Sequence, residues 1–249
     1  MSLEIKNLNV SVAKNRILND VCFDIQKSGL TALVGPSGSG KSTILKAING
    51  LLKFDSGFEV KGKITFKGNC ILSHKKSVSP DIVMVFQKPT PFPISIYKNI
   101  SIVLNSFGLS KSSENQRVED CLRQVGLWDE VSHRLRHSAL SLSGGQQQRL
   151  CLARAIALNP EIICLDEPCS HLDPLSSQKV ERALHELKKS KKILMVTHNL
   201  QQAKRLADDV ILLWNQENGG EIIEQGSVHS VFNHPKHKYT EMYINGDLG

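Results

Sequence analysis

A glycine-rich segment near the N-terminus limits the folds that this chain can adopt. Residues 35–42 read GPSGSGKS and fit the pattern G-x-x-x-x-G-K-[ST], which binds the phosphates of a nucleoside triphosphate. The preceding residues 30–34 are a continuous apolar run, and residues 41–51 have a helical pattern. Glycines let the backbone amides of such a loop turn inward around an anion, at the positive end of the helix. The segment therefore predicts a buried strand, a phosphate-binding loop and a helix.

Several positions of this loop have an expected part in binding. We expect Lys41 to reach the β- and γ-phosphates and the hydroxyl of Ser42 to bind Mg²⁺. The alternative is a glycine-rich turn without a ligand, and the strand and helix on either side argue against it. The expected nucleotide-binding residues of this segment are Gly35, Pro36, Ser37, Gly38, Ser39, Gly40, Lys41, Ser42 and Thr43.

The composition is that of an ordinary globular protein, with 40% hydrophobic and 22% charged residues. No apolar run approaches the roughly 18–20 residues that a membrane-spanning helix needs. The N-terminus has neither the basic flank nor the apolar region of a signal peptide, so we expect the protein to stay in the cytosol. Its 6 cysteines include no C-x-x-C pair, so neither a zinc site nor a disulfide framework is expected.

The net charge of +7 is compatible with nucleic acid or an anionic membrane surface as a partner. The basic residues are spread along the chain, however, and only 3 Tyr and 2 Trp are present for base stacking. We therefore expect no nucleic-acid partner.

Alternating strand and helix patterns predict an α/β fold with a mostly parallel sheet and right-handed crossovers. Residues 95–157 interrupt this alternation with a mostly helical pattern, which predicts an insertion. The expected division of the single domain 1–249 is a nucleotide-binding core, 1–87 and 158–249, and a helical subdomain, 88–157. Strands are expected over residues 3–10, 21–25, 30–34, 60–66, 82–86, 162–165, 193–196, 210–214 and 221–224, and further helices over 174–187, 200–207 and the C-terminus.

Two carboxylates end the apolar strand expected over residues 162–165. In open α/β sheets the ligand lies beyond the carboxyl ends of the strands. Asp166 is therefore expected beside the Mg²⁺ held by Ser42, and Glu167 is placed to polarise an attacking water. The alternative is a solvated acidic pair before Pro168, which the upstream glycine loop makes the weaker interpretation.

Two further polar residues follow buried strands. His198 comes after the strand at 193–196, where it can contact the γ-phosphate and sense its loss. Gln87 comes after the strand at 82–86, where the sequence changes to the helical pattern, and it can bridge Mg²⁺ and the attacking water. The alternatives are a surface histidine and a solvent-facing turn residue.

A second glycine-rich turn opens a helix about a hundred residues after the first. Ser143 can cap this helix, and the exposed amides can bind a second phosphate group. The alternative is an ordinary capped helix start. Two phosphate-binding turns indicate that nucleotide is held from two sides, as in a two-subunit motor. The expected binding residues are Ser143, Gly144, Gly145 and Gln146.

Together these motifs resemble the nucleotide-binding subunits of ABC transporters over nearly the whole chain. The resemblance implies a P-loop NTPase (RecA-like) core, a small N-terminal antiparallel part and an inserted α-helical subdomain. It also implies ATP and Mg²⁺ as ligands, and a homodimer that holds two ATP molecules between the glycine loop of one copy and the second turn of the other. The implied motifs are Walker A at 35–42, the Q-loop Gln87, the signature at 142–146, Walker B with Asp166, the catalytic Glu167, the D-loop at 170–173 and the switch His198.

A narrower resemblance is to the phosphate-import ATP-binding proteins, carried by residues 86–97, 143–151, 197–203 and 243–246. It implies inorganic phosphate as cargo, two integral membrane permease subunits, an external phosphate-binding protein as an indirect partner, and a peripheral location at the cytoplasmic face of the cell membrane.

Three alternatives to this function remain. They are an importer ATPase for another cargo, such as an amino acid or another anion, a soluble ABC ATPase that acts in DNA maintenance or translation, and a regulatory module that holds ATP without hydrolysing it. Two positions also depart from the family pattern. Val12 stands where an aromatic residue usually stacks on adenine, and His171 stands where a small residue is usual.

Overall fold

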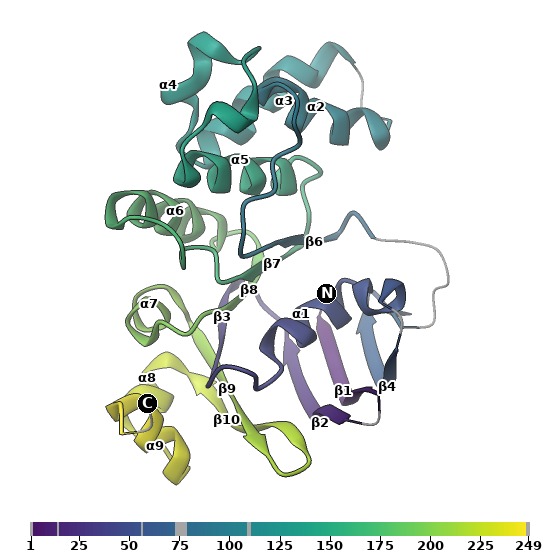
Figure 1. Ribbon diagram of the computed structural model, residues 1–249, viewed down its shortest axis with the longest axis vertical. Coiled ribbons are helices and arrows are strands. Elements are labelled where there is room, and N and C mark those ends of the chain that lie inside the picture. Colours follow the sequence, from purple (N-terminus) through teal and green to yellow (C-terminus); the bar gives the residue numbers. More distant parts are fainter. Residues whose placement is uncertain (1, 14, 56, 73–78, 109–110, 248–249) are drawn as a thin grey trace. The chain divides into compact units, whose positions relative to one another are not determined.

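The computed structural model describes residues 2–13, 15–55, 57–72, 79–108 and 111–247 (Figure 1). The chain divides into two compact units, of which the first combines Met1–Ser79 with Lys192–Gly249 and the second is Pro80–Lys191. The expected helical subdomain, 88–157, lies inside the second unit, and its standing as a subdomain of its own stays a prediction.

The first unit is built on a mixed sheet in the order β5-β4-β1-β2-β10-β9-β3-β8. Its N-terminal part is antiparallel, because β1 pairs with β2 and with β4 in that sense, whereas β3 pairs in parallel with β8 and β9 (Figure 1). This arrangement confirms the predicted combination of an antiparallel part and a parallel core. The strands are β1 (Leu3–Val12), β2 (Asn15–Ile25), β3 (Gly29–Val34), β4 (Phe58–Phe66), β5 (Asn69–Cys70), β8 (Lys192–Val196), β9 (Asp209–Gln216) and β10 (Gly219–Ser227).

The core of this unit lies around β3. Leu30 and the residues from Thr31 to Val34 are all buried, as the continuous apolar run predicts for a strand covered on both faces. Helix α1 (Lys41–Ile48) follows the glycine loop and buries Ile44, Leu45 and Ile48. The loop is therefore held between two elements that are anchored in the core.

Several expected element boundaries of the first unit differ from the structure, and two of these differences have a clear local cause. The helix expected to reach residue 51 ends at Ile48, because Gly50 adopts a left-handed φ of +66° and a short 3-10 helix, η1 (Leu51–Phe54), follows. Strand β2 begins at Asn15 rather than at residue 21, because Asn15 pairs with Val12 across the hairpin. This pairing adds polar residues to a strand that apolar alternation alone does not identify.

The C-terminal segment of the first unit forms helices beside β9 and β10 (Figure 1). The structure has two short helices after β10, α8 and α9, where one was expected, and each has a side-chain cap, from Ser227 and His237 respectively. This segment consists of α8 (Val228–Asn233) and α9 (Lys238–Asn245), whereas α7 (Leu200–Leu206) precedes β9 in the chain and contacts β3.

The second unit contains the parallel strands β6 (Ile82–Val85) and β7 (Ile162–Asp166) and most of the helices (Figure 1). Helix α5 contacts α2, α3, α6 and β6, and it buries Leu150, Leu152 and Ile156 among them. The helices are α2 (Ile96–Ser106), α3 (Lys111–Gln124), α4 (Trp128–Val131), η2 (Ser132–Arg134), η3 (Ala139–Ser141), α5 (Gly144–Ile156) and α6 (Pro174–Leu187).

Helix α6 spans the residues expected for it. Asp173 accepts hydrogen bonds from the amides of Leu175 and Ser176, and Pro174 occupies the first turn, where its missing N–H costs nothing. Within the described part of the chain, no helix has the length and apolar character needed to cross a bilayer.

Candidate nucleotide-binding site

The glycine loop joins β3 to α1 and requires glycine for steric reasons. A Cβ atom on Gly35 would lie 2.0 Å from the carbonyl oxygen of Leu213, and one on Gly40 would lie 2.5 Å from the side chain of Leu18. Gly38 has a φ of +79°, and a Cβ atom placed on it would have no neighbour within 4 Å, so its glycine serves the backbone conformation and leaves space above the loop. The sequence thus gives the loop both its turn and its open face.

Lys41 lies at the start of α1 and is buried, with 7% of the residue exposed. Its Nζ donates hydrogen bonds to the carbonyl oxygens of Gly35, at 2.9 Å, and Pro36, at 2.6 Å. The first turn of α1 contains no acidic residue, so no carboxylate of this turn would repel an anion bound at the positive end of the helix. Ser42 and Thr43, both half-buried, continue the same turn. The loop therefore presents a cation and helix amides together, which is the chemistry that binds phosphate.

His198 follows the neighbouring strand of the same unit. Strands β3 and β8 are parallel, with Leu33 paired to Val196, so the glycine loop and His198 leave the sheet at the same edge. The turn is held by Thr197, whose hydroxyl donates to Gln202 at 2.9 Å and accepts from the amide of Asn199 at 3.0 Å. His198 itself is exposed. The structure thus places it on the face where the loop opens.

In the second unit, the structure brings Gln87 and Glu167 together. Strands β6 and β7 are parallel, with Val85 paired to Leu165, and each of these two side chains follows that pair by two residues. The Nε2 atom of Gln87 donates to Oε2 of Glu167 at 3.0 Å and to the hydroxyl of Ser170 at 3.3 Å. A predicted base and a predicted water-bridging residue therefore share one hydrogen bond.

The backbone of Glu167 is in the left-handed region, with a φ of +45°. Such a conformation is uncommon for residues other than glycine and is typical of functional sites. Its carbonyl oxygen accepts hydrogen bonds from the amide and the hydroxyl of Ser170, at 3.2 and 3.1 Å. Asp166, the last residue of β7, is half-buried. The turn after β7 therefore holds Glu167 in a conformation that the chain would not adopt by itself.

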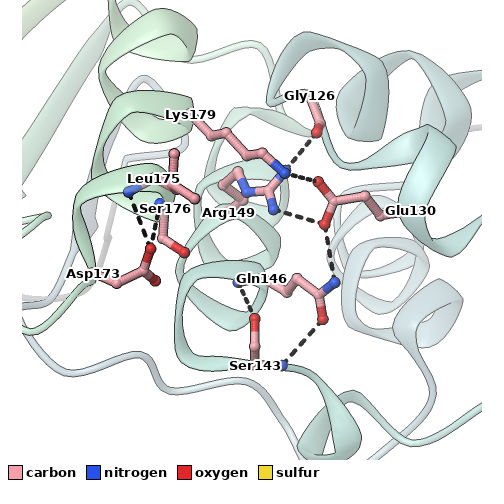
Figure 2. Close-up of polar contacts among 9 residues, drawn as sticks. All are labelled: Gly126, Glu130, Ser143, Gln146, Arg149, Asp173, Leu175, Ser176 and Lys179. Carbon is pink, nitrogen blue, oxygen red and sulfur yellow. Dashed lines mark hydrogen bonds and ion pairs between the residues drawn. The ribbon is translucent and has the colours of Figure 1, made fainter.

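The second glycine-rich turn forms a capping box at the start of α5. The hydroxyl of Ser143 accepts from the amide of Gln146 at 3.4 Å, and Oε1 of Gln146 accepts from the amide of Ser143 at 3.1 Å (Figure 2). By helix geometry, the amides of Gly144 and Gly145 have no intrahelical acceptor. The turn therefore offers helix amides that can donate to a phosphate group, as the prediction of a phosphate-binding turn requires.

The two glycines of this turn differ in what they do for the fold. A Cβ atom on Gly145 would lie 2.4 Å from the hydroxyl oxygen of Ser176 on α6, so packing requires glycine there. Gly144 has no atom within 4 Å of a Cβ position and no left-handed φ. The fold itself therefore does not explain the glycine at 144, whereas close approach of a ligand would.

A cluster around Glu130 of α4 was missed by sequence reasoning (Figure 2). Its carboxylate accepts hydrogen bonds from Arg149, Lys179 and Gln146, at 2.9, 2.7 and 2.9 Å. Partial burial raises the pKa of Glu130, but these three donors outweigh it and lower the pKa to about 2. The S-x-x-Q pattern of the capping box could have been found in the sequence; the partners of Glu130 could not, because they lie on other helices.

The expected site residues thus fall into two groups. The glycine loop and His198 lie in the first unit, whereas Gln87, Asp166, Glu167 and the signature lie in the second. The binding, metal-ligating and catalytic parts expected for all of them stay predictions.

Comparisons with known proteins agree on the family. The sequence profile of the ABC transporter family matches residues 18–170. The chain is 46% identical to "Phosphate import ATP-binding protein PstB 2" of Bacillus licheniformis, over 99% of this chain and 90% of that protein. It is 43% identical to "Phosphate import ATP-binding protein PstB" of Thermotoga maritima, over 99% of this chain and 98% of that protein.

A solved structure described as "Structure of ATP binding subunit of ABC transporter" has the same fold. The TM-score is 0.80 at 25% identity, and the match covers 100% of both chains. The profile match, the two relatives and this structure lead to one conclusion: the chain belongs to the ABC transporter family.

Proposed function

We propose that this chain is the ATP-hydrolysing subunit of an ABC importer for inorganic phosphate. The observation that carries the proposal is the full-length identity, 43% to 46%, to proteins named phosphate import ATP-binding proteins. The complete set of motifs, in one order along the chain, supports the same activity.

In this proposal two copies of the chain hold two ATP molecules between them. Each ATP lies between the glycine loop of one copy and the signature turn of the other. Lys41 neutralises charge on the β- and γ-phosphates, and the amides of the signature turn receive the γ-phosphate from the opposite side. Glu167 accepts a proton from the attacking water, and His198 contacts the γ-phosphate.

The expected metal ligands fit Mg²⁺. Ser42, Gln87 and Asp166 offer hydroxyl, amide and carboxylate oxygens, which are the hard ligands that this ion prefers. When bound, the ion neutralises charge on the β- and γ-phosphates. The hydrogen bond from Gln87 to Glu167 links a metal ligand of this set to the proposed base.

A hollow in the helical part of the second unit supports contact with a membrane subunit. It has a volume of about 740 Å³ and combines apolar and basic side chains. Nearby, Phe92 is 43% exposed and lies under the guanidinium of Arg154 at 4.3 Å. We propose that each of the two copies of the chain contacts one integral membrane permease subunit here, so that the complex contains two such subunits and the chain lies at the cytoplasmic face of the membrane. The hollow is lined by Ile94, Ser95, Tyr97, Lys98, Asn115, Leu135 and Arg136.

Transport in proteoliposomes tests the cargo. The chain is first used to pull its permease subunits from native membranes, and the complex is reconstituted with the external phosphate-binding protein. Uptake of labelled phosphate that needs ATP supports the proposal, and Glu167→Gln in the same complex is the matched control. Uptake of an amino acid or another anion in place of phosphate would assign another cargo. Recovery of nucleic acid in place of permease subunits would refute the transport function and support a soluble ABC ATPase.

A further inference from the structure

One carboxylate in the second unit collects hydrogen-bond donors from two neighbouring helices. Glu130 lies on α4, Gln146 and Arg149 lie on α5, and Lys179 lies on α6 (Figure 2). Oε2 of Glu130 accepts from Arg149 and Gln146, and Oε1 accepts from Lys179. Glu130 therefore joins three helices that are separate in the sequence.

Arg149 makes this cluster costly to disturb. Its side chain is 2% exposed, and it also donates to the carbonyl oxygen of Gly126. Its Nε atom is buried and makes no hydrogen bond within the described part of the chain. A buried guanidinium needs a charged partner, and Glu130 provides it. The arginine in turn holds the carboxylate of Glu130 ionised and in place.

Gln146 connects this cluster to the start of α5. Its side-chain amide is used at both ends, because Oε1 accepts from the amide of Ser143 while Nε2 donates to Glu130. An amide group held at both ends has one orientation and one rotamer. Glu130 thereby determines how Gln146 closes the capping box, 16 residues further along the chain.

Helix α6 holds the same end of α5 from another side. Ser176 occupies the space against Gly145 that a methyl group would fill, and Lys179, one turn later, reaches Glu130 at 2.7 Å. The N-terminal turn of α5 is therefore fixed by α4 and α6 together, while the space at Gly144 stays open.

We propose that Glu130 is a positioning residue for ATP hydrolysis, which acts through Gln146 to hold the amides of the signature turn in the orientation that receives the γ-phosphate of ATP. The inference rests on the proposed function, because the signature turn is taken to bind nucleotide held by the glycine loop of a second copy. Glu130 itself touches neither nucleotide nor water in this role.

The sharpest variant is Gln146→Glu. Glutamate at this position retains the capping box with Ser143, so the helix start stays folded, but it replaces the donor to Glu130 by a second carboxylate. We expect kcat to fall about tenfold or more, as for loss of one well-placed donor group. Binding of a fluorescent ATP analogue to the isolated chain should change by less than about twofold, because the glycine loop is untouched.

A reciprocal pair of substitutions separates positioning from mere stability. Glu130→Gln should lower kcat to a similar extent, and the double variant Glu130→Gln/Gln146→Glu restores one donor and one acceptor between the same positions. We expect the double variant to recover to within about threefold of the wild-type kcat, a coupling that independent sites do not show. Glu119→Gln is the matched control, because Glu119 is half-buried like Glu130 but pairs with Arg123 of its own helix, α3.

The outcomes are distinct for the inference and for the proposed function. A wild-type chain that does not hydrolyse ATP would refute the proposed function. A wild-type chain that hydrolyses ATP, with Gln146→Glu folded by circular dichroism and fully active, would overturn the part assigned to Glu130. The part assigned to Glu130 would also be overturned if the fold-loss in kcat of the double variant equalled the product of the losses of the two single variants. If Glu130→Gln does not fold, Gln146→Glu still decides the matter.

Discussion

Gln87 and Glu167 are 80 residues apart in the sequence and share a hydrogen bond of 3.0 Å between Nε2 and Oε2. The glutamine begins the segment that leads into the helices of the second unit, and the glutamate follows β7 in a left-handed conformation. A movement of the Gln87 segment therefore changes the surroundings of the proposed base directly. This contact gives a physical route by which contact with a membrane subunit can alter hydrolysis.

Replacing Glu167 by Gln should stop turnover and leave nucleotide binding intact. The amide has the shape of the carboxylate but does not accept a proton from water, so we expect kcat to fall about a hundredfold or more, with ATP affinity within about twofold. Steady-state hydrolysis and calorimetric binding measure the two effects. Glu186→Gln on the surface of α6 serves as control, and undiminished hydrolysis by Glu167→Gln would remove Glu167 from its catalytic part.

Lys41→Met should weaken ATP binding without unfolding the chain. Methionine has a similar length and keeps the apolar part of the side chain, whereas the charged hydrogen bonds to phosphate are lost. Since such bonds contribute about 1.5–3 kcal/mol each, ATP affinity should fall about 10- to 100-fold. Calorimetry compares this variant with Lys46→Met, in the last turn of the same helix. Equal affinities for the two variants would contradict the assignment.

The two glycines of the signature turn should respond in opposite ways to alanine. Gly145→Ala forces a Cβ atom against Ser176 and should destabilise the chain by about 1–3 kcal/mol. Gly144→Ala meets open space, so stability should be unchanged or slightly raised, while kcat falls about tenfold because the methyl group occupies the space of the phosphate. Urea unfolding and ATP hydrolysis on both variants test this. Full activity in Gly144→Ala would show that the open space is not a ligand site.

Adding an aromatic ring at Val12 should strengthen nucleotide binding. Val12 ends β1, half-buried and opposite Phe58 of β4. If base–aromatic stacking at this position contributes about 1–3 kcal/mol, Val12→Tyr should tighten ATP binding about tenfold and change the ratio of ATP to GTP affinity. Ser11→Tyr is the matched control, because neighbouring side chains of a strand point to opposite faces. Wild type and Val12→Tyr with the same affinities for both nucleotides would refute the expectation.

Ionisation of Glu130 should make the free energy of unfolding depend on pH in the acidic range. Partial burial raises the folded-state pKa of Glu130, but the donors from Arg149, Lys179 and Gln146 outweigh it and lower the pKa to about 2, below the ordinary value of 4.5. The stabilisation is therefore present above about pH 4.5 and is lost as the pH falls toward about 2. Allowing for solvent screening, we expect it to amount to about 1–2 kcal/mol.

Urea unfolding at several pH values measures this contribution of Glu130. The difference in unfolding free energy between wild type and Glu130→Gln should shrink as the pH falls from about 5 to about 3. Glu119→Gln provides the comparison, because Glu119 is exposed to a similar extent but pairs with Arg123 of its own helix. A difference that stays constant over this range would show that ionisation of Glu130 does not stabilise the fold.

Much of the fold was predictable because its signals are local. The apolar run of β3, the glycines of the loop and the cap and proline that begin α6 each act over a few residues, and the structure confirms the elements that they predicted. The expected boundaries were wrong where pairing between strands or a left-handed glycine decided them, as at Asn15 and Gly50.

The site divides in the same way. The amino-acid order alone specified which residues are expected to carry the chemistry. A phosphate loop, a capped helix start and a carboxylate after a buried strand are each recognisable from a few consecutive residues. Which side chains meet was settled by tertiary packing, as Gln87 meets Glu167 and as Glu130 meets Gln146, Arg149 and Lys179. The reason is physical: hydrogen bonds between distant segments form only after the burial of apolar faces has brought their helices and strands together, and no pattern within one segment encodes that packing.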